Sequence, residues 1–254
     1  MPTDPRETFS RSADRYLKST DHRAGPDLET IRDAARRILP RVTLDVATGA
    51  GHALRVAAPF SAFCLAQDLT LEMLKVTREH LASVGIEGVS CIQSRADGIP
   101  VGDGCVDLVL CRIACHHFPS VPAFLGEVRR ILSPEGILLL IDSLAPSDVD
   151  GDRFINTVER IRDPSHVRSL DREQWRDHIK GSGLRVKEEK KFERRHPFDE
   201  WVERVGLKGA GLRALEREFV EAPEHIKDQF HIEISETGQV LSYTDEKIIF
   251  VAGR

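Results

Sequence analysis

The chain has 254 residues and a formal net charge of −5; 41% of its residues are hydrophobic and 30% are charged. This balance is typical of one large α/β domain, alone or with a small appendage, and it offers no basic surface for nucleic acid. No apolar run approaches the roughly 20 residues of a membrane span, and the N-terminus lacks the apolar segment of a secretory signal. We therefore expect a cytoplasmic protein that binds neither nucleic acid nor membrane.

The cysteines are odd in number and lack the spacing of a disulfide framework; they are Cys64, Cys91, Cys105, Cys111 and Cys115. Four of them lie in or beside apolar runs, so we expect buried free thiols. Cys111, Cys115 and His116 are metal-ligand residue types, but no second ligand pair with zinc spacing follows them. No metal site is therefore expected.

Two helices are predicted at the start of the chain. Residues 9–16 form a short one, on which Phe9 and Tyr16 are aromatic anchors. Residues 27–39 form the second, because apolar residues recur on one helical face and Pro40 ends the pattern.

The stretch Val42–Ala53, VTLDVATGAGHA, organises our interpretation of the chain. Its apolar, β-branched start predicts a buried strand. Gly49 and Gly51 then indicate a sharp turn whose backbone another group can approach closely. A short helix-compatible segment follows and stops at Pro59. Strand, glycine turn and helix open a nucleotide-binding α/β unit, whose ligand lies at the carboxyl end of the strand.

An acidic residue ends the next predicted strand. Residues 62–66 are apolar and lead into Asp68, roughly 20 residues past the glycines, where a carboxylate is placed to accept hydrogen bonds from a ribose diol. Alternatively, Asp68 caps the following helix, although Thr70 already offers a cap. The third glycine of the dinucleotide fingerprint is missing, because Leu54 stands in its place.

Strands and helices continue to alternate up to residue 142. Helices are predicted from Thr70 to about residue 84 and over residues 121–132; strands are predicted over residues 88–94, 105–111 and 137–142. This alternation indicates a parallel sheet with right-handed crossovers.

The pattern changes after residue 145. Residues 145–170 are polar, and a helix opens near Asp171. The remaining elements are a charged outer strand over 184–192, an amphipathic helical insertion over 196–228, a hairpin over 230–243 and a closing strand over 247–252.

Four segments in series, LDVATGAG, AQDLTLEML, ADGIPVGDGCVDLVLCRIACHHF and EVRRILSPEGILLLID, resemble the class I S-adenosylmethionine-dependent methyltransferases. The similarity is greatest to the subgroup that includes the ubiquinone/menaquinone-biosynthesis enzymes, and it extends from about Phe9 to Leu184. The resemblance implies a Rossmann-like α/β fold with seven mostly parallel strands in the order 3-2-1-4-5-7-6, the last strand antiparallel. It also implies an N-terminal helical cap over residues 1–40 and a methyltransferase domain over residues 41–254. The helical insertion, about 196–228, would precede the last strands and determine much of the acceptor specificity.

The resemblance also implies a set of cofactor contacts. The methionine end would lie on the first turn, the ribose on Asp68, and the adenine near Leu69 and the backbone N–H of Ala96. Arg112 would contact the cofactor or an acidic acceptor group, and Tyr16 would lie near the methionine end unless it only anchors its helix. The first-turn residues are Asp45, Ala47, Thr48, Gly49 and Gly51.

Two positions depart from the family pattern. Ala47 replaces the first glycine of the turn, which is tolerable if its φ is negative. Arg95 stands where the family has the acid that accepts the adenine amino group, and a guanidinium cannot accept a hydrogen bond. We therefore expect Asp97 to take over that amine.

A histidine pair, His116 and His117, follows the fourth predicted strand, whose carboxyl end faces cofactor and acceptor in the family. Imidazole titrates near neutral pH, so either histidine is a candidate general base; alternatively, one of them only orients a loop. His22 and the segment His166–Arg168 are candidates to close over the same opening, or are solvated loop residues.

The function expected from these features is methyl transfer from S-adenosylmethionine to an O, N or C atom of a small molecule, with S-adenosylhomocysteine as product. Methyl transfer from a sulfonium is an in-line displacement that depends mainly on positioning. Two alternatives stay open: a nicotinamide-dependent oxidoreductase, and a binding module that has lost catalysis. The sequence indicates neither the acceptor nor the oligomeric state.

Overall fold

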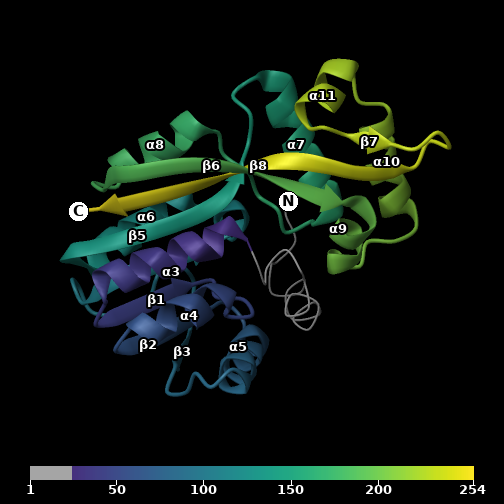
Figure 1. Cartoon of the computed structure of the whole chain (residues 1–254). Coiled ribbons are helices and arrows are strands. Elements are labelled where there is room, and N and C mark those ends of the chain that lie inside the picture. Colours follow the sequence, from purple (N-terminus) through teal and green to yellow (C-terminus); the bar gives the residue numbers. More distant parts are fainter. Residues whose placement is uncertain (1–24) are drawn as a thin grey trace.

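The computed structural model describes residues 25–254. Its centre is one sheet with the strand order β3-β2-β1-β4-β5-β8-β6 (Figure 1). Strands β1 to β5 are parallel, whereas β8 runs antiparallel to both β5 and β6. The strands are β1 (Val42–Val46), β2 (Phe63–Asp68), β3 (Ser90–Gln93), β4 (Val106–Arg112), β5 (Leu132–Leu144), β6 (Arg185–Pro197), β7 (Glu233–Ile234) and β8 (Val240–Gly253).

The predicted order 3-2-1-4-5-7-6 is confirmed, with β8 in the place of the seventh strand. The short β7 is an additional strand that pairs with β8, as the predicted hairpin required. The prediction of separate strands over 240–243 and 247–252 was wrong, because β8 is continuous. The charged residues between them, Asp245 and Glu246, did not end the strand because their backbone stays paired with β6.

Helices cover both faces of the sheet. On one face lie α6 (Val121–Ile131) and α8 (Arg172–Gly181), and on the other lie α3 (Pro26–Ile38) and α4 (His52–Ala57). Successive side chains of β4 alternate between the two cores: Val109 joins the α6 side and Leu110 joins the α3 side. The strand is therefore buried on both faces, as its continuous apolar sequence predicted.

Short elements complete this half of the molecule. The helix α5 (Leu71–Ser83) packs beside β2 and begins at Thr70, whose hydroxyl accepts a hydrogen bond from Met73 N–H as predicted. Two short 3-10 helices are η1 (Ala58–Phe60) and η2 (Cys115–His117). Of the predicted cap over residues 1–40, residues 1–24 lie outside the described part, and α3 packs directly on the sheet.

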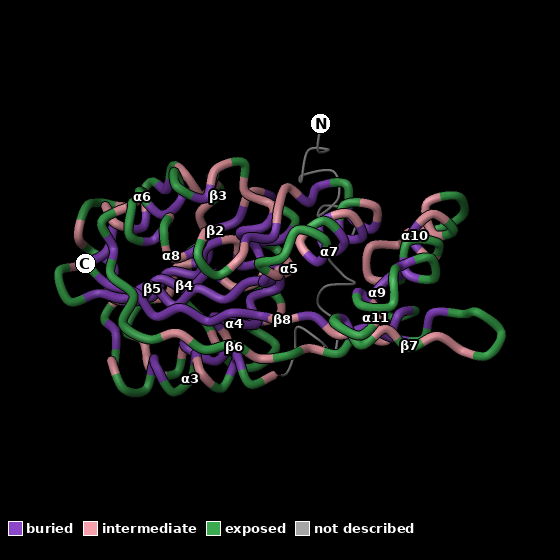
Figure 2. The backbone as a smooth tube through the Cα atoms, turned by 90° about the horizontal axis from the view of Figure 1, so that it is seen from above, coloured by how far each residue is buried: buried purple, intermediate pink, exposed green. Residues whose placement is uncertain are grey.

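A second core lies at the far ends of β6 and β8. It is formed by α7 (Val149–Arg162), α9 (Phe198–Val205), α10 (Ala210–Val220) and α11 (Glu224–Gln229), together with the first residues of β8. Figure 2 shows both long strands running from the main sheet into this part. Its buried aromatic side chains are Phe154, Phe198, Trp201, Phe219, Phe230 and Tyr243.

Helix α7 was not predicted, because the polar sequence of residues 145–170 gives no clear helical pattern. Its apolar side is a narrow stripe, Phe154, Ile155 and Val158, in a highly charged sequence. Asp148 caps the helix by accepting a hydrogen bond from Gly151 N–H.

All five cysteines are free, as expected, but only Cys111 and Cys115 are buried, and Cys105 is exposed.

Within residues 25–254, no helix has the length and apolar character that crossing a membrane requires.

Candidate active site

The turn between β1 and α4 is held by the end of β2. Gln67 accepts a hydrogen bond from Ala47 N–H on its side-chain Oε1 (3.0 Å), and its backbone carbonyl accepts one from Thr48 N–H (2.9 Å). These contacts hold Ala47 at φ +52°, so the negative φ that would make an alanine tolerable there is not found. The left-handed conformation suits the glycine that Ala47 replaces, and the alanine Cβ adds strain.

The two glycines of the turn have different surroundings. Gly49 has φ +55° and open space where a Cβ would project. Gly51 has φ +79°, and a Cβ there would lie 2.9 Å from Cγ2 of Thr77. Gly49 therefore leaves room for a ligand, whereas Gly51 allows α4 and α5 to approach closely.

Asp45, at the end of β1, is buried beneath this turn. Its carboxylate accepts a hydrogen bond from the Thr48 hydroxyl at 2.6 Å. Burial raises the pKa of Asp45 to about 7, because the ionised form loses its hydration. Asp45 therefore supports the turn through Thr48.

Asp68 connects the ends of the first two strands. Its Oδ2 accepts a hydrogen bond from Gly49 N–H (3.1 Å), and its Oδ1 accepts one from Thr70 N–H (3.0 Å). Thr70, and not Asp68, caps α5. Burial raises the pKa of Asp68 and outweighs these hydrogen bonds. The carboxylate is thus fixed beside the open turn at Gly49.

The predicted adenine region contains an ion pair that the sequence reasoning did not foresee. Arg95 donates to both oxygens of Asp97, each at 2.7 Å. This bidentate bond holds the pKa of Asp97 below its usual value. The other two residues predicted to contact the adenine, Leu69 and Ala96, are half-buried. An adenine amine would therefore share Asp97 with Arg95.

Arg112 ends β4 and is buried against α3. Its Nε donates to Asp27 Oδ2 at 2.6 Å, and Arg194 of β6 donates to Asp27 Oδ1 at 3.3 Å. Burial lowers the pKa of Arg112. The residue thus has a structural partner, Asp27, that the sequence reasoning missed. Tyr16 and His22 lie outside the described residues.

The histidine pair lies on η2, immediately after β4. His116 donates from Nδ1 to Asp142 Oδ1 at 2.6 Å, and its backbone N–H donates to Asp142 Oδ2 at 3.1 Å. Burial disfavours the imidazolium, but the Asp142 carboxylate outweighs burial and raises the pKa of His116. Asp142 lies near the end of β5; its position at a strand end was the available sequence signal.

His117 has different surroundings from His116. Its Nδ1 lies 3.1 Å from the hydroxyl of Ser165, and that hydroxyl donates to Asp163 at 2.6 Å. Burial and the neighbouring His116 lower the pKa of His117 to about 4. The His117 ring is therefore neutral at neutral pH.

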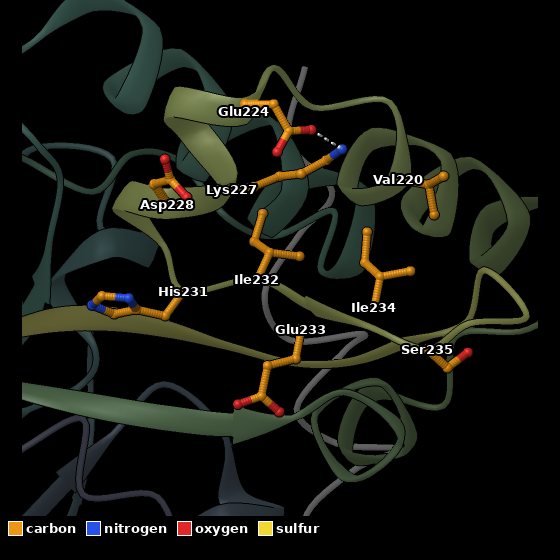
Figure 3. A pocket seen from close by; sticks show the side chains of 9 residues that line it. All are labelled: Val220, Glu224, Lys227, Asp228, His231, Ile232, Glu233, Ile234 and Ser235. Atoms are coloured by element: carbon orange, nitrogen blue, oxygen red, sulfur yellow. Dashed lines mark hydrogen bonds and ion pairs between the residues drawn. The ribbon is translucent and has the colours of Figure 1, made fainter.

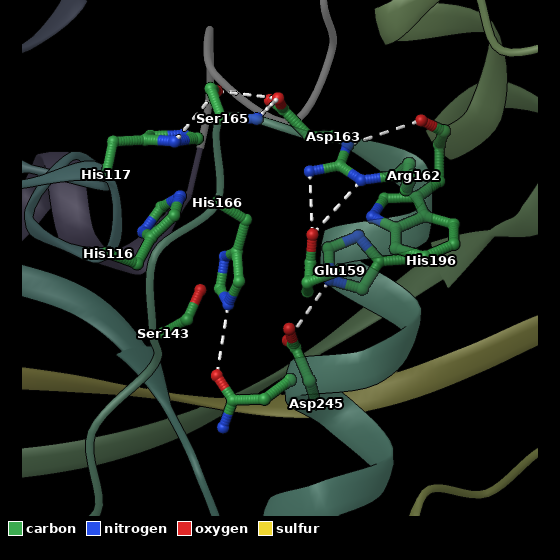
Figure 4. Close-up of polar contacts among 12 residues, drawn as sticks. His116, His117, Ser143, Glu159, Arg162, Asp163, Ser165, His166, His196 and Asp245 are labelled. Carbon is green, nitrogen blue, oxygen red and sulfur yellow. Dashed lines mark hydrogen bonds and ion pairs between the residues drawn. The ribbon is translucent and has the colours of Figure 1, made fainter. Parts of the chain in front are cut away.

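The segment after α7 packs onto the pair, which is one of the two alternatives left open for residues 166–168. The N–H groups of Val167 and Arg168 donate to the carbonyl of His116 at 2.8 and 3.1 Å. The His166 ring centre lies 5.5 Å from that of His116 and 6.4 Å from that of His117 (Figure 4). Three imidazoles from two distant segments thus meet at one place.

A family model described as a methyltransferase domain matches residues 44–140. The uncharacterized methyltransferase YcgJ of Bacillus subtilis (strain 168) is 30% identical over 241 residues, 95% of this chain and 95% of that protein. Its crystal structure gives a TM-score of 0.85 over 89% of this chain and 97% of that one. A proposed methyltransferase of Bacillus halodurans C-125 gives a TM-score of 0.86 at 33% identity, over 90% of this chain and 98% of that one.

The chain belongs to the class I S-adenosylmethionine-dependent methyltransferases. The expected likeness to quinone-biosynthesis enzymes is also found: the demethylmenaquinone methyltransferase of Thermus thermophilus is 32% identical over 145 residues, 54% of this chain and 65% of that protein. The nicotinamide-dependent alternative has no remaining observation in its favour.

The cofactor of this methyltransferase class is S-adenosylmethionine, and the residues at the strand ends fit it. The open side of Gly49 accommodates a close ligand, and Asp68 is fixed next to it by two backbone N–H groups. Among the described residues, no group of three or more His, Cys, Asp or Glu side chains is arranged to hold a metal ion.

A separate hollow lies in the methyltransferase's C-terminal part (Figure 3). Its lining comes from α10, α11, β7 and their connections: Val220, Glu224, Lys227, Asp228, His231, Ile232, Glu233, Ile234 and Ser235. None of the predicted cofactor or catalytic residues lines it.

Proposed function

We propose that the protein transfers the methyl group of S-adenosylmethionine to a nucleophilic O, N or C atom of a small molecule, with His116 as general base. The observation that carries this proposal is the hydrogen-bonded pair of His116 and Asp142 beside the β1 turn. In the sheet, Val46 of β1 pairs with Cys111 of β4, so the loops after these two strands are neighbours.

The cofactor, when bound, supplies an electrophilic methyl group on its sulfonium. We assign the ribose hydroxyls to Asp68 and the methionine end to the turn Ala47–Gly49. Leu69, the N–H of Ala96 and the carboxylate of Asp97 are assigned to the adenine. These residues act by positioning, because in-line displacement requires the nucleophile at near-attack distance rather than covalent help from the protein.

The hydrogen bond to Asp142 determines which nitrogen of His116 can act. Asp142 is ionised, because the pKa of its carboxyl is held below the usual value: burial is outweighed by His116, Ser143 N–H and Lys247. Nδ1 of His116 is therefore the donor, and in the neutral ring the lone pair is on Nε2. As the new bond to the acceptor forms, the acceptor's proton passes to Nε2, and Asp142 stabilises the resulting imidazolium.

His117 is assigned a binding role. The Ser165 hydroxyl donates its single hydrogen to Asp163, so at its contact with His117 it accepts from Nδ1–H. With a pKa of about 4, His117 is a weak base at neutral pH.

The first test is calorimetry with S-adenosylmethionine and S-adenosylhomocysteine on the wild type and on Asp68→Ala. We expect binding that weakens at least about tenfold, roughly 1.4 kcal/mol, in the variant. Binding to neither protein would contradict the proposal. A binding module that has lost catalysis would bind the cofactor but form no S-adenosylhomocysteine with any of a panel of hydroxyl, amine and carbon acceptors.

A further inference from the structure

A buried polar cluster lies beside the proposed base. Its buried members come from α7 and the segment after it: Asn156, Asp163, Ser165, His166 and Ser169. The half-buried His117 lies beside them, and Figure 4 labels it together with Asp163, Ser165 and His166. Several side-chain atoms in it have no hydrogen-bond partner among the described residues. Buried polar atoms are nearly always partnered in folded proteins, so such a group requires an explanation.

The protonation of His166 follows from its contact with Asn156. The backbone N–H of Ser169 donates to Asn156 Oδ1 at 2.8 Å, which identifies that atom as the amide oxygen. His166 Nε2 lies 3.0 Å from the same oxygen and must therefore donate to it. Burial, reinforced by His116, lowers the pKa of His166 to about 3, so the ring is neutral. Its Nδ1 then carries a lone pair.

This lone pair of His166 has no donor among residues 25–254, and the side chain is only 1% exposed. The second oxygen of Asp163, Oδ2, likewise accepts no hydrogen bond from a described residue, and Asp163 is also 1% exposed. Its Oδ1 accepts hydrogen bonds from the N–H and hydroxyl of Ser165. Both groups lacking a partner are therefore acceptors, and what the cluster needs is a donor.

The charges of the cluster lead to the same conclusion. The carboxylates near the three histidines are Asp142, which is bonded to His116, and three that form ion pairs: Glu159 with Arg162 (2.8 Å), Asp152 with Arg168 (2.9 Å) and Asp245 with Lys247 (2.6 Å). A fourth cation, Arg160, donates to the carbonyl of Val167 (3.3 Å), and His116 is neutral when it acts as the base. Asp163 is a fifth carboxylate and forms no ion pair with a described residue. An anionic group of a ligand would therefore be repelled by the excess negative charge around Asp163.

We propose that His166 Nδ1 and Asp163 Oδ2 bind the methyl acceptor, and that the acceptor carries a hydrogen-bond-donating group, an amine or a hydroxyl, rather than a carboxylate or phosphate. This inference rests on the proposed function, because it places the acceptor beside His116. His166 and Asp163 are then specificity-determining residues, whereas proton removal stays with His116.

The test uses the full chain with nitrogen-15-labelled histidine, saturated with S-adenosylhomocysteine. The probes are phenethylamine, phenethyl alcohol and phenylacetate, which are similar in size and differ in their polar group. We expect the amine, the alcohol or both to shift the unprotonated Nδ1 signal of His166, since that nitrogen becomes a hydrogen-bond acceptor. Phenylacetate should leave the signal unchanged.

Two variants support the assignment. His166→Phe removes the signal, and Asp163→Asn keeps the shape and the oxygen that Ser165 needs while replacing Oδ2 by a donor. Asp163→Asn should weaken the donor probes at least about tenfold without changing the affinity for S-adenosylhomocysteine. His225→Gln, on an exposed part of α11, is the matched control and should change nothing.

The inference is overturned if phenylacetate is the probe that shifts His166, or if no donor probe shifts it at about 10 mM, well above millimolar dissociation constants. It is also overturned if Asp163→Asn binds the donor probes as the wild type does. Failure to bind S-adenosylhomocysteine at all would instead contradict the proposed function, so the two failures are distinguishable.

Discussion

Asp142 accepts two hydrogen bonds from a single residue, His116, one from the ring Nδ1 at 2.6 Å and one from the backbone N–H at 3.1 Å. The two contacts fix both the ring orientation and the loop that carries it. Because His116 and Asp142 are coupled, the pH dependence of the reaction rate should report an apparent pKa that belongs to the pair.

We expect kcat/KM to fall as the pH is lowered through the raised pKa of His116, because the base must be neutral to accept a proton. Asp142→Asn removes the carboxylate, so the acidic limb should move to lower pH and the maximal rate should drop by about 10²- to 10⁴-fold. The measurement is the pH–rate profile of both proteins with an acceptor found by screening. A rate independent of pH from about 5 to 9 would contradict His116 as the base.

Acid should destabilise the protein through His166. Its folded pKa of about 3 lies below the unfolded value of about 6.5, so the unfolded chain binds more protons between these values. The free energy of unfolding should fall as pH decreases below about 6.5, by up to about 1.4 kcal/mol per pH unit for this group. His116 acts oppositely: its raised pKa contributes stability that is complete below about 6.5 and is lost as pH rises through the folded value.

Urea unfolding at a series of pH values tests this expectation. The acid-induced decrease should be smaller in His166→Phe, whatever the stability of that variant at neutral pH. The exposed His225→Gln should keep the slope of the wild type. Equal slopes in all three proteins would contradict the assigned protonation of His166.

Ala47→Gly should stabilise the protein by about 0.5–1 kcal/mol. Glycine relieves the strain of φ +52°, which outweighs the larger entropy it gives the unfolded chain. Ala214→Gly within α10 is the control and should cost about 1 kcal/mol. Thermal unfolding of both variants provides the comparison, and a destabilised Ala47→Gly would show that the alanine methyl makes a contact worth more than the strain.

Gly49→Ala and Gly51→Ala should have different effects, the first mainly on cofactor affinity and the second mainly on stability. Both place an alanine at positive φ, but only the Cβ at Gly51 meets a side chain, at 2.9 Å from Thr77. Gly51→Ala should therefore lose more stability, whereas Gly49→Ala should lose about 1 kcal/mol and bind S-adenosylmethionine at least about tenfold more weakly. Unchanged cofactor affinity in Gly49→Ala would exclude the cofactor from this turn.

The order of the sheet was predictable because its buried strands are continuous apolar runs. The helices between them have ends that the sequence marks, such as the N-cap at Thr70. The first turn was predictable as a turn, but the φ of Ala47 was not. Its sign depends on Gln67, a side chain 20 residues away whose contact with the turn exists only in the folded sheet.

The surroundings of the histidines were the least predictable part. The type and position of His116 suggested a base, but its partner Asp142 is 26 residues away and is brought to it by the pairing of β4 with β5. His166 and Asp163 follow a helix that the charged sequence of residues 149–162 concealed. The Arg95–Asp97 pair was readable in principle, since the two residues are only two positions apart, yet nothing in the sequence favours that contact over solvation.

The C-terminal part is attached to the main sheet by β6 and β8, which are paired with each other along nearly their whole length. Apart from one irregularity between Val186 and Glu188, the ladder of backbone hydrogen bonds is continuous, so this pair of strands resists bending. If the acceptor binds beside His116 as proposed, its exchange does not use a swing of the C-terminal part as a separate body. Among the described residues, the loop 163–170 lacks such a ladder and packs on His116, so we expect exchange to depend on this loop.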